Sequence, residues 1–81
     1  MGMGIRSRKY QLTGLGIERL TYLEYKQNLT DGQWFESRLL SDIEGGVDNN
    51  EGDLVFGSPR SEAATKAKLR RMVKEGLVRI A

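Results

Sequence analysis

The sequence contains neither cysteine nor histidine. Without cysteine, no disulfide can cross-link the fold and no thiolate can hold a metal ion; without histidine, the commonest general acid–base is also missing. These two absences exclude zinc fingers, thiol proteases, serine–histidine triads and redox motifs. Since the carboxylates form no credible acid–base pair either, we expect a protein that is not an enzyme, with no catalytic residue, no cofactor and no metal site.

Long apolar runs are lacking as well. No run approaches the roughly 18 residues of a membrane span. The N-terminal "MGMGIRSRKY" has cations without a following apolar stretch, unlike a signal peptide. We therefore expect a cytoplasmic protein with no membrane partner. Its 81 residues predict a single small domain with a marginal core, either complete or the N-terminal domain of a longer protein.

Net charge is low, but its distribution is uneven. The formal charge is +3 over residues 1–30, −6 over residues 31–53 and +5 over residues 54–81. This pattern predicts that the two basic ends share a surface while the acidic middle faces elsewhere. The alternative is an ordinary mixed surface with chance clustering.

The first half of the chain predicts an arm and two helices. Residues 1–12 read as a basic arm with a short extended segment, and residues 13–81 as a helical domain. The glycines of residues 13–16 are expected to break the chain before a helix over residues 17–27, where a strand is the alternative. A second helix is predicted from residue 31 by the capping-box pattern of Thr30 and Gln33. Its apolar positions are Phe35, Leu39, Leu40 and Ile43, and Gly45-Gly46 ends it.

The second half predicts an acidic turn, a short strand and a basic helix. Residues 45–53 are rich in turn formers, and residues 54–57 read as a short apolar strand. The last helix is expected over about residues 60–75, with Ser58 as its cap and Pro59 in its first turn. Gly76 ends that helix, and residues 77–80 read as a strand. The predicted fold class is mainly α, with three helices and a small β element.

The last helix divides into an apolar and a basic side. Its apolar side comprises Thr65, Leu69, Met72 and Val73. Its basic side intersperses small residues with cations, a composition that lets a helix backbone approach a groove while long side chains reach phosphates or base edges. Guanidinium groups suit bidentate contacts and lysines act as point charges. A solvated helix face is the alternative. The candidate DNA-binding cations on this helix are Lys66, Arg70, Arg71 and Lys74, with Arg6, Arg8 and Lys9 of the N-terminal arm as minor-groove contacts.

"LRRMVKEGLVRI" resembles the recognition helix and first wing strand of winged helix-turn-helix regulators. The resemblance covers residues 57–80, and "FGSPRSEAATKAKL" is similar to the entry of that helix. It implies a winged-helix-like fold in which the side chains of Arg60, Ser61, Thr65 and Lys66 face DNA.

Two departures from the family stand out. The family joins its second and third helices by a turn of a few residues, whereas residues 45–57 form a far longer connection. Either this segment holds a hairpin or an extra turn, or residues 31–44 are not the family's second helix. The sequence also ends before a second wing strand returns; alternatively, residues 54–56 pair with residues 77–80 and there is no wing.

We therefore predict the DNA-binding domain of a regulatory protein, with the helix over about residues 60–75 in the major groove of double-stranded DNA. A homodimer is expected, because one small basic helix rarely gives enough affinity or site length alone. The alternative is a protein–protein interaction or assembly module that meets a protein partner through the acidic loop over residues 42–53.

Overall fold

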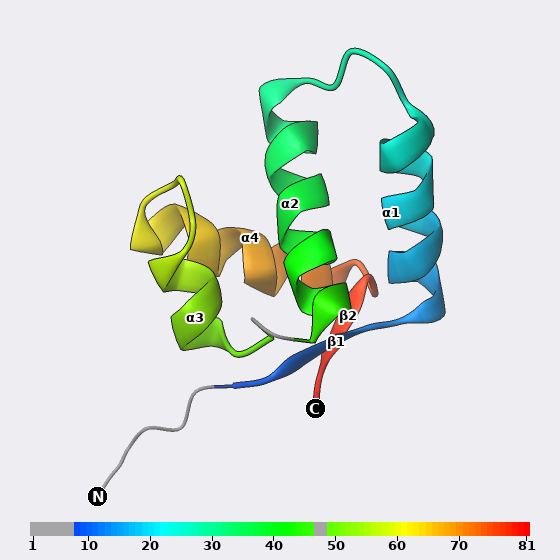
Figure 1. Ribbon diagram of the computed structural model, residues 1–81. Helices are drawn as coiled ribbons and strands as arrows, with labels where there is room; N and C mark the ends of the chain where they lie inside the picture. Colours follow the sequence, from blue (N-terminus) through cyan, green and yellow to red (C-terminus); the bar gives the residue numbers. More distant parts are fainter. Residues whose placement is uncertain (1–7, 47–48) are drawn as a thin grey trace, which may run out of the picture.

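The computed structural model describes residues 8–46 and 49–81, and these residues form four helices and two short strands. The fold is mainly α with a small β element, as predicted (Figure 1). The described residues hold one helix more than the three expected. In chain order the elements are β1 (Tyr10–Leu12), α1 (Gly14–Tyr25), α2 (Asp31–Gly45), α3 (Glu51–Phe56), α4 (Glu62–Lys74) and β2 (Val78–Ile80).

The two strands bring distant parts of the chain together. β1 pairs antiparallel with β2, so that Tyr10 lies opposite Ile80 and Leu12 opposite Val78. The extended segment near residue 12 and the strand after Gly76 are thus confirmed. The alternative pairing through residues 54–56 is wrong, because those residues belong to α3. An apolar run that short does not distinguish a strand from a helix.

The first helix begins earlier than predicted. The Thr13 hydroxyl caps it by accepting a hydrogen bond from Gly16 N–H at 3.1 Å, so the glycines of residues 13–16 open the helix instead of breaking the chain. Gly16 is required by packing, since a Cβ there would lie 2.0 Å from the carbonyl oxygen of Leu77. Leu20 and Leu23 point into the core, whereas Ile17 is half exposed.

The second helix follows its sequence signals closely. Thr30 Oγ1 accepts from Gln33 N–H, and Gln33 Oε1 accepts from Thr30 N–H, both at 3.1 Å, which confirms the capping box. Gly46 ends the helix in the left-handed region with φ of 76°. The four predicted apolar positions are all buried.

A short helix and a turn precede α4. The Asn50 side chain caps α3 by accepting from Asp53 N–H at 2.9 Å. Ser61, not Ser58, caps α4, since its hydroxyl accepts from Ala64 N–H at 3.1 Å. Ser58 Oγ instead accepts from Arg60 N–H within the turn at 3.0 Å. α4 therefore begins at residue 62, later than the sequence indicated.

The core lies between α1 and α2, which run antiparallel, and α4, which crosses behind α2 (Figure 1). α3 packs against α4, and β2 continues from α4 to meet β1. Among the described residues, no helix combines the length and apolar character that crossing a lipid bilayer demands. The buried apolar residues are Tyr10, Leu20, Leu23, Phe35, Leu39, Leu40, Ile43, Leu54, Leu69, Met72, Leu77 and Val78.

Candidate nucleic-acid interface

α4 presents small and cationic side chains to solvent. Leu69 and Met72 are buried and Val73 is partly buried, as the helical pattern predicted. The opposite side of the helix is open, so its alanines and cations lie at the surface together. The exposed residues of this side, called here the α4 face, are Ala63, Ala64, Ala67, Arg70, Arg71 and Lys74.

Thr65 does not belong to that face. Its exposed fraction is 0%, and its hydroxyl lies 2.7 Å from Ser58 Oγ and donates to the carbonyl oxygen of Ser61 at 2.9 Å. The helical pattern placed Thr65 on the apolar side, and that placement is confirmed. Its assignment as a DNA-facing residue, which came from the family resemblance, is wrong in this structure because the side chain ties the turn over residues 58–61 to α4.

Lys66, Arg60 and Lys68 are already ion-paired, Lys68 with Glu36. Lys66 Nζ lies 2.8 Å from the Glu62 carboxylate, whose hydrogen bond raises the pKa of Lys66. Arg60 pairs with Asp31 at the start of α2 and lies over the Phe35 ring, 4.7 Å from its centroid. Ser61, also predicted to face DNA, is exposed but engaged as the cap of α4.

Arg70, Arg71 and Lys74 differ from these cations. Among residues 8–46 and 49–81, none of the three forms an ion pair. Their positive charge is therefore not neutralised by a described carboxylate. They follow one another along the exposed side of α4 with Ala67 beside them, so the C-terminal half of the helix carries the available charge.

A shallow pocket adjoins the α4 face. Its volume is about 250 Å³, and it lies between the start of α2 and the middle of α4. Phe35, Ala64 and Ala67 contribute apolar surface, while Arg60 and Arg71 contribute charge. The pocket extends the positive surface of α4 toward α2.

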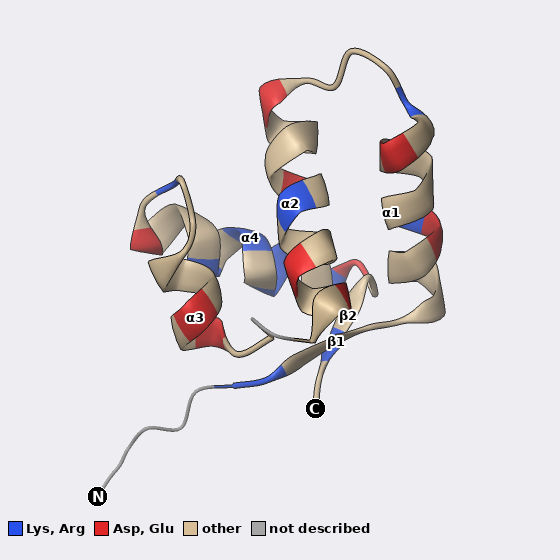
Figure 2. Ribbon diagram, viewed as in Figure 1, with Lys and Arg blue, Asp and Glu red and all other residues tan. Residues whose placement is uncertain are grey.

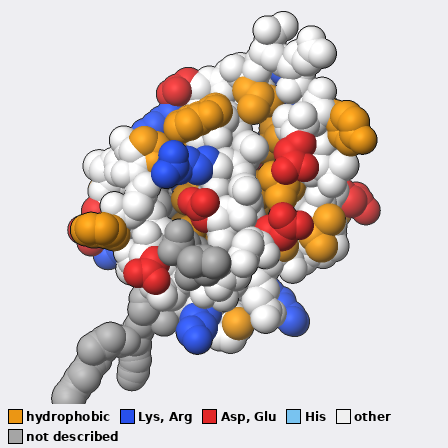
Figure 3. Space-filling view, in the orientation of Figure 1, with side chains coloured by type: hydrophobic (Ala, Val, Ile, Leu, Met, Phe, Trp, Pro, Cys, Tyr) orange, Lys and Arg blue, Asp and Glu red, His pale blue; other side chains and the backbone are white. Residues whose placement is uncertain are grey.

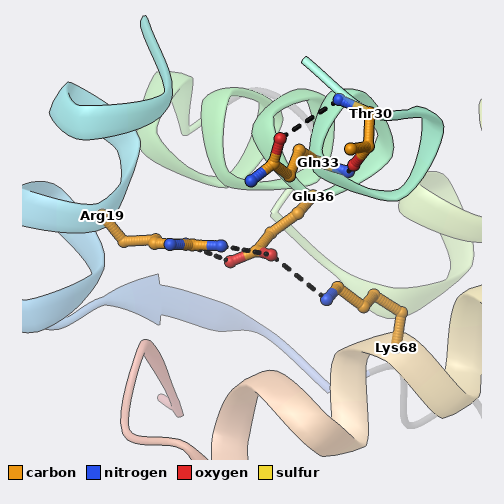
Figure 4. Close-up of polar contacts among 5 residues, drawn as sticks. All are labelled: Arg19, Thr30, Gln33, Glu36 and Lys68. Carbon is orange, nitrogen blue, oxygen red and sulfur yellow. Dashed lines mark hydrogen bonds and ion pairs between the residues drawn. The ribbon is translucent and has the colours of Figure 1, made fainter. Parts of the chain in front are cut away.

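The buried carboxylate of Glu36 joins three helices (Figure 4). Arg19 of α1 donates to it from Nε at 2.9 Å and from Nη2 at 3.3 Å, and Lys68 Nζ of α4 lies 3.3 Å from Oε1. Burial pushes the pKa of Glu36 up, but the hydrogen bonds and charges of Arg19 and Lys68 outweigh it, so the pKa lies below its ordinary value. Sequence analysis missed this role, although Glu36 stands between Phe35 and Leu39 on a buried helix face.

The N-terminal cations are partly fixed in place. Arg6 lies outside the described residues. Arg8 and Lys9 are exposed, and their main chain is bonded on both sides: Glu51 N–H donates to the Arg8 carbonyl at 2.7 Å and Ala81 N–H to the Lys9 carbonyl at 2.8 Å. These two residues are therefore anchored between α3 and β2, not carried on a free arm. The two basic ends of the chain, which were predicted to share a surface, meet where β1 pairs with β2.

The acidic middle does not simply face elsewhere. Asp31 and Glu36 turn toward Arg60 and Lys68, so part of this acidic segment neutralises the basic end. Other carboxylates lie on α3, which packs against α4 (Figure 2). Within the described ranges, no group of three or more candidate ligands could hold a metal ion.

The arrangement of α3 and α4 bears on the long connection noted in the sequence. Residues 46–50 lead into α3, and residues 57–61 then join α3 to α4 across a short turn that includes Gly57. α3 and α4 pack against each other across this turn. The helix that directly precedes α4 is thus α3, and α2 comes before it in the chain.

No protein-family model, curated protein or solved structure matches this chain significantly. Its function must therefore be argued from the geometry of these surfaces.

Proposed function

We propose that this protein binds double-stranded DNA by placing the α4 face in the major groove, as the DNA-binding domain of a cytoplasmic regulatory protein. One observation carries the proposal. Arg70, Arg71 and Lys74 extend from an exposed helix side that is otherwise made of alanines, and none of the three is paired with a described carboxylate.

The dimensions suit a groove. A major groove about 12 Å wide admits one helix, and a helix with side chains is about 10–12 Å across. Alanines at positions 63, 64 and 67 narrow α4 on the approaching side. The cations then lie toward the C-terminal end, where each can reach a phosphate or a base edge.

The neighbouring elements support the same orientation. α3 packs against α4 through the short turn, as the first helix of a helix-turn-helix packs against its recognition helix. Arg71 also lines the pocket beside α2, so the positive surface of α4 continues there. In this arrangement the paired Lys66 is a weaker phosphate contact than Lys74, because its charge is shared with Glu62.

The test measures the salt dependence of binding. Fluorescence anisotropy with a mixed-sequence duplex gives the association constant at several salt concentrations. Each phosphate contact contributes about −0.9 to the slope of log K against log salt. Replacing Arg70, Arg71 and Lys74 with alanine is expected to reduce that slope by up to about 2.7 in magnitude.

A matched control separates α4 from general positive charge. Lys26→Ala removes one cation at the end of α1, and Lys74→Ala removes one from α4. Lys74→Ala should reduce the slope by about 0.9 and Lys26→Ala should leave it unchanged. Equal effects of the two variants, or full binding by the triple variant, would contradict the proposal.

A second candidate function is a protein-interaction module at the acidic segment. The side chain of Phe56, at the end of α3, is 92% exposed, next to the carboxylates of that helix. A basic partner segment with an apolar anchor would fit there. No DNA binding at low salt, together with a partner complex weakened by Phe56→Ser, would favour this second function.

A further inference from the structure

The outer side of α1 is unusually apolar for an exposed helix. Leu15 is 58% exposed, Ile17 50%, Tyr22 51% and Tyr25 83%. Its opposite side already packs on α2 through Leu20 and Leu23. The residues of this outer side, called here the α1 face, are Leu15, Ile17, Glu18, Thr21, Tyr22 and Tyr25.

The members of the α1 face form a continuous strip. Leu15, Glu18, Tyr22 and Tyr25 follow at steps of three, four and three residues, which places them along one side of a helix. Glu18 is the only one of these six residues with a side chain that is charged at neutral pH. The strip contains no cation, in contrast to the α4 face, and the exposed Glu24 borders it beside Ile17. Figure 3 shows hydrophobic and acidic side chains on the side of the molecule where α1 lies. Tyr22 and Tyr25 are of the aromatic type that protein interfaces favour. Figure 1 shows α1 at the margin of the molecule, where a neighbour has access.

One residue of the strip is held in position before any partner arrives. The Arg19 guanidinium lies 5.5 Å from the centroid of the Tyr22 ring, and Arg19 is itself fixed by two hydrogen bonds to Glu36. A side chain ordered in advance loses less conformational entropy on association. The buried carboxylate that joins the helices thus also orders the surface of α1.

We propose that the α1 face binds a second copy of this chain across a twofold axis. Two α1 helices packed antiparallel place Leu15 of each copy opposite Tyr25 of the other, and Glu18 opposite a Tyr22 hydroxyl that can donate to it. The same apolar strip is then buried on both sides, as an isologous interface requires. The antiparallel arrangement also sets the positive end of each helix dipole beside the negative end of the other.

The exposed area shows which size class of interface this dimer would belong to. With 150–250 Å² for a whole aromatic side chain, the exposed parts of the four apolar residues amount to roughly 450 Å² per copy, or about 900 Å² for both. Specific interfaces begin near 1,000 Å², so the contact is expected to dissociate in the micromolar range. A basic peptide or an anionic lipid surface is a poorer occupant, because the strip offers one carboxylate to the first and no cation to the second.

This inference deepens the proposed DNA binding, since a twofold pair presents two α4 helices to adjacent half-sites, but it is tested without DNA. Sedimentation equilibrium from about 1 to about 300 µM spans the affinity expected from the area. The wild-type chain should shift from monomer to dimer over that range. Tyr25→Glu and Leu15→Ser should each raise the dissociation constant at least about tenfold, the effect of losing about 1.4 kcal/mol.

Phe56→Glu is the matched control, because Phe56 is more exposed than any residue of the strip but lies on α3. It should leave the dissociation constant unchanged. A wild-type chain that stays monomeric throughout, a dimer that survives both α1 variants, or a dimer lost in Phe56→Glu would each overturn the assignment. A monomer that still binds DNA with the expected salt slope refutes only the dimer, whereas a dimer without DNA binding refutes only the proposed function.

Discussion

Replacing Glu36 with glutamine tests how strongly the buried carboxylate stabilises the fold. The change keeps the shape of the side chain but removes its charge, so Arg19 and Lys68 lose their anionic partner. Hydrogen bonds to charged groups contribute about 1.5–3 kcal/mol, and breaking a fully buried ion pair costs about 3–5 kcal/mol. The side chains of Arg19 and Lys68 are 34% and 18% exposed, so both cations retain access to water.

We therefore expect Glu36→Gln to lower the free energy of unfolding by about 2 kcal/mol at neutral pH. In a domain of this size such a loss corresponds to a fall in Tm of roughly 8–16 °C. Urea denaturation followed by far-ultraviolet circular dichroism measures it. Glu44→Gln is the control, because Glu44 is exposed on the same helix, and it should change stability by less than about 0.5 kcal/mol.

The pH dependence gives a second and independent check. The folded protein holds the pKa of Glu36 below its ordinary value of 4.5, so the unfolded chain takes up a proton first as the pH falls. The stability from this carboxylate is fully present above the ordinary pKa and is lost as the pH falls through the lower, folded pKa. The difference between wild type and Glu36→Gln should therefore shrink below pH 4.5. A difference that is absent at pH 7, or constant through the acidic range, would refute the reasoning.

Further substitutions test the packing and capping of the same fold. Gly16→Ala should destabilise the fold by about 2 kcal/mol or more, since its Cβ would meet the Leu77 carbonyl at 2.0 Å. Gly14→Ala, whose Cβ would have nothing within 4 Å, should be neutral or slightly stabilising. Thermal melts of the two variants compare them. Thr30→Ala should cost about 1 kcal/mol in urea denaturation by removing the cap of α2, and an unchanged midpoint would contradict that role. Thr65→Val should lower stability by about 1–2 kcal/mol yet leave the salt slope of DNA binding unaltered, because the hydroxyl is buried and bonded within the turn.

Local signals in the sequence predicted much of α2 and of the inward side of α4. The capping box of Thr30 and Gln33 and the regular spacing of Phe35, Leu39 and Ile43 depend on neighbours within a few residues, which a sequence shows directly. The strand after Gly76 was predicted in the same way, from a glycine followed by a short apolar run, and in the structure that glycine has a φ of 79°.

The misses came from contacts between distant residues. Position 16 must be glycine because Leu77, far along the chain, leaves no room for a side chain. Short-range rules instead treat a glycine at this place as a break. α3 is a helix of six residues in which Leu54 is the buried one. It is too short to show a periodic apolar pattern in the sequence. Asp31 and Glu36 neutralise Arg60 and Lys68 of the candidate site. The tertiary fold alone places these two carboxylates near α4.

The antiparallel pairing of β1 with β2 also sets how the domain responds to mechanical force. The chain enters the sheet at Tyr10 and leaves it at the paired Ile80, so the two ends emerge at the same edge. Tension applied through the two ends breaks the residue pairs of this sheet one after another, instead of loading all of them at once. Unfolding under load is then expected to start at the sheet and proceed to the contact of Gly16 with Leu77, so that α1 is freed before α2 separates from α4.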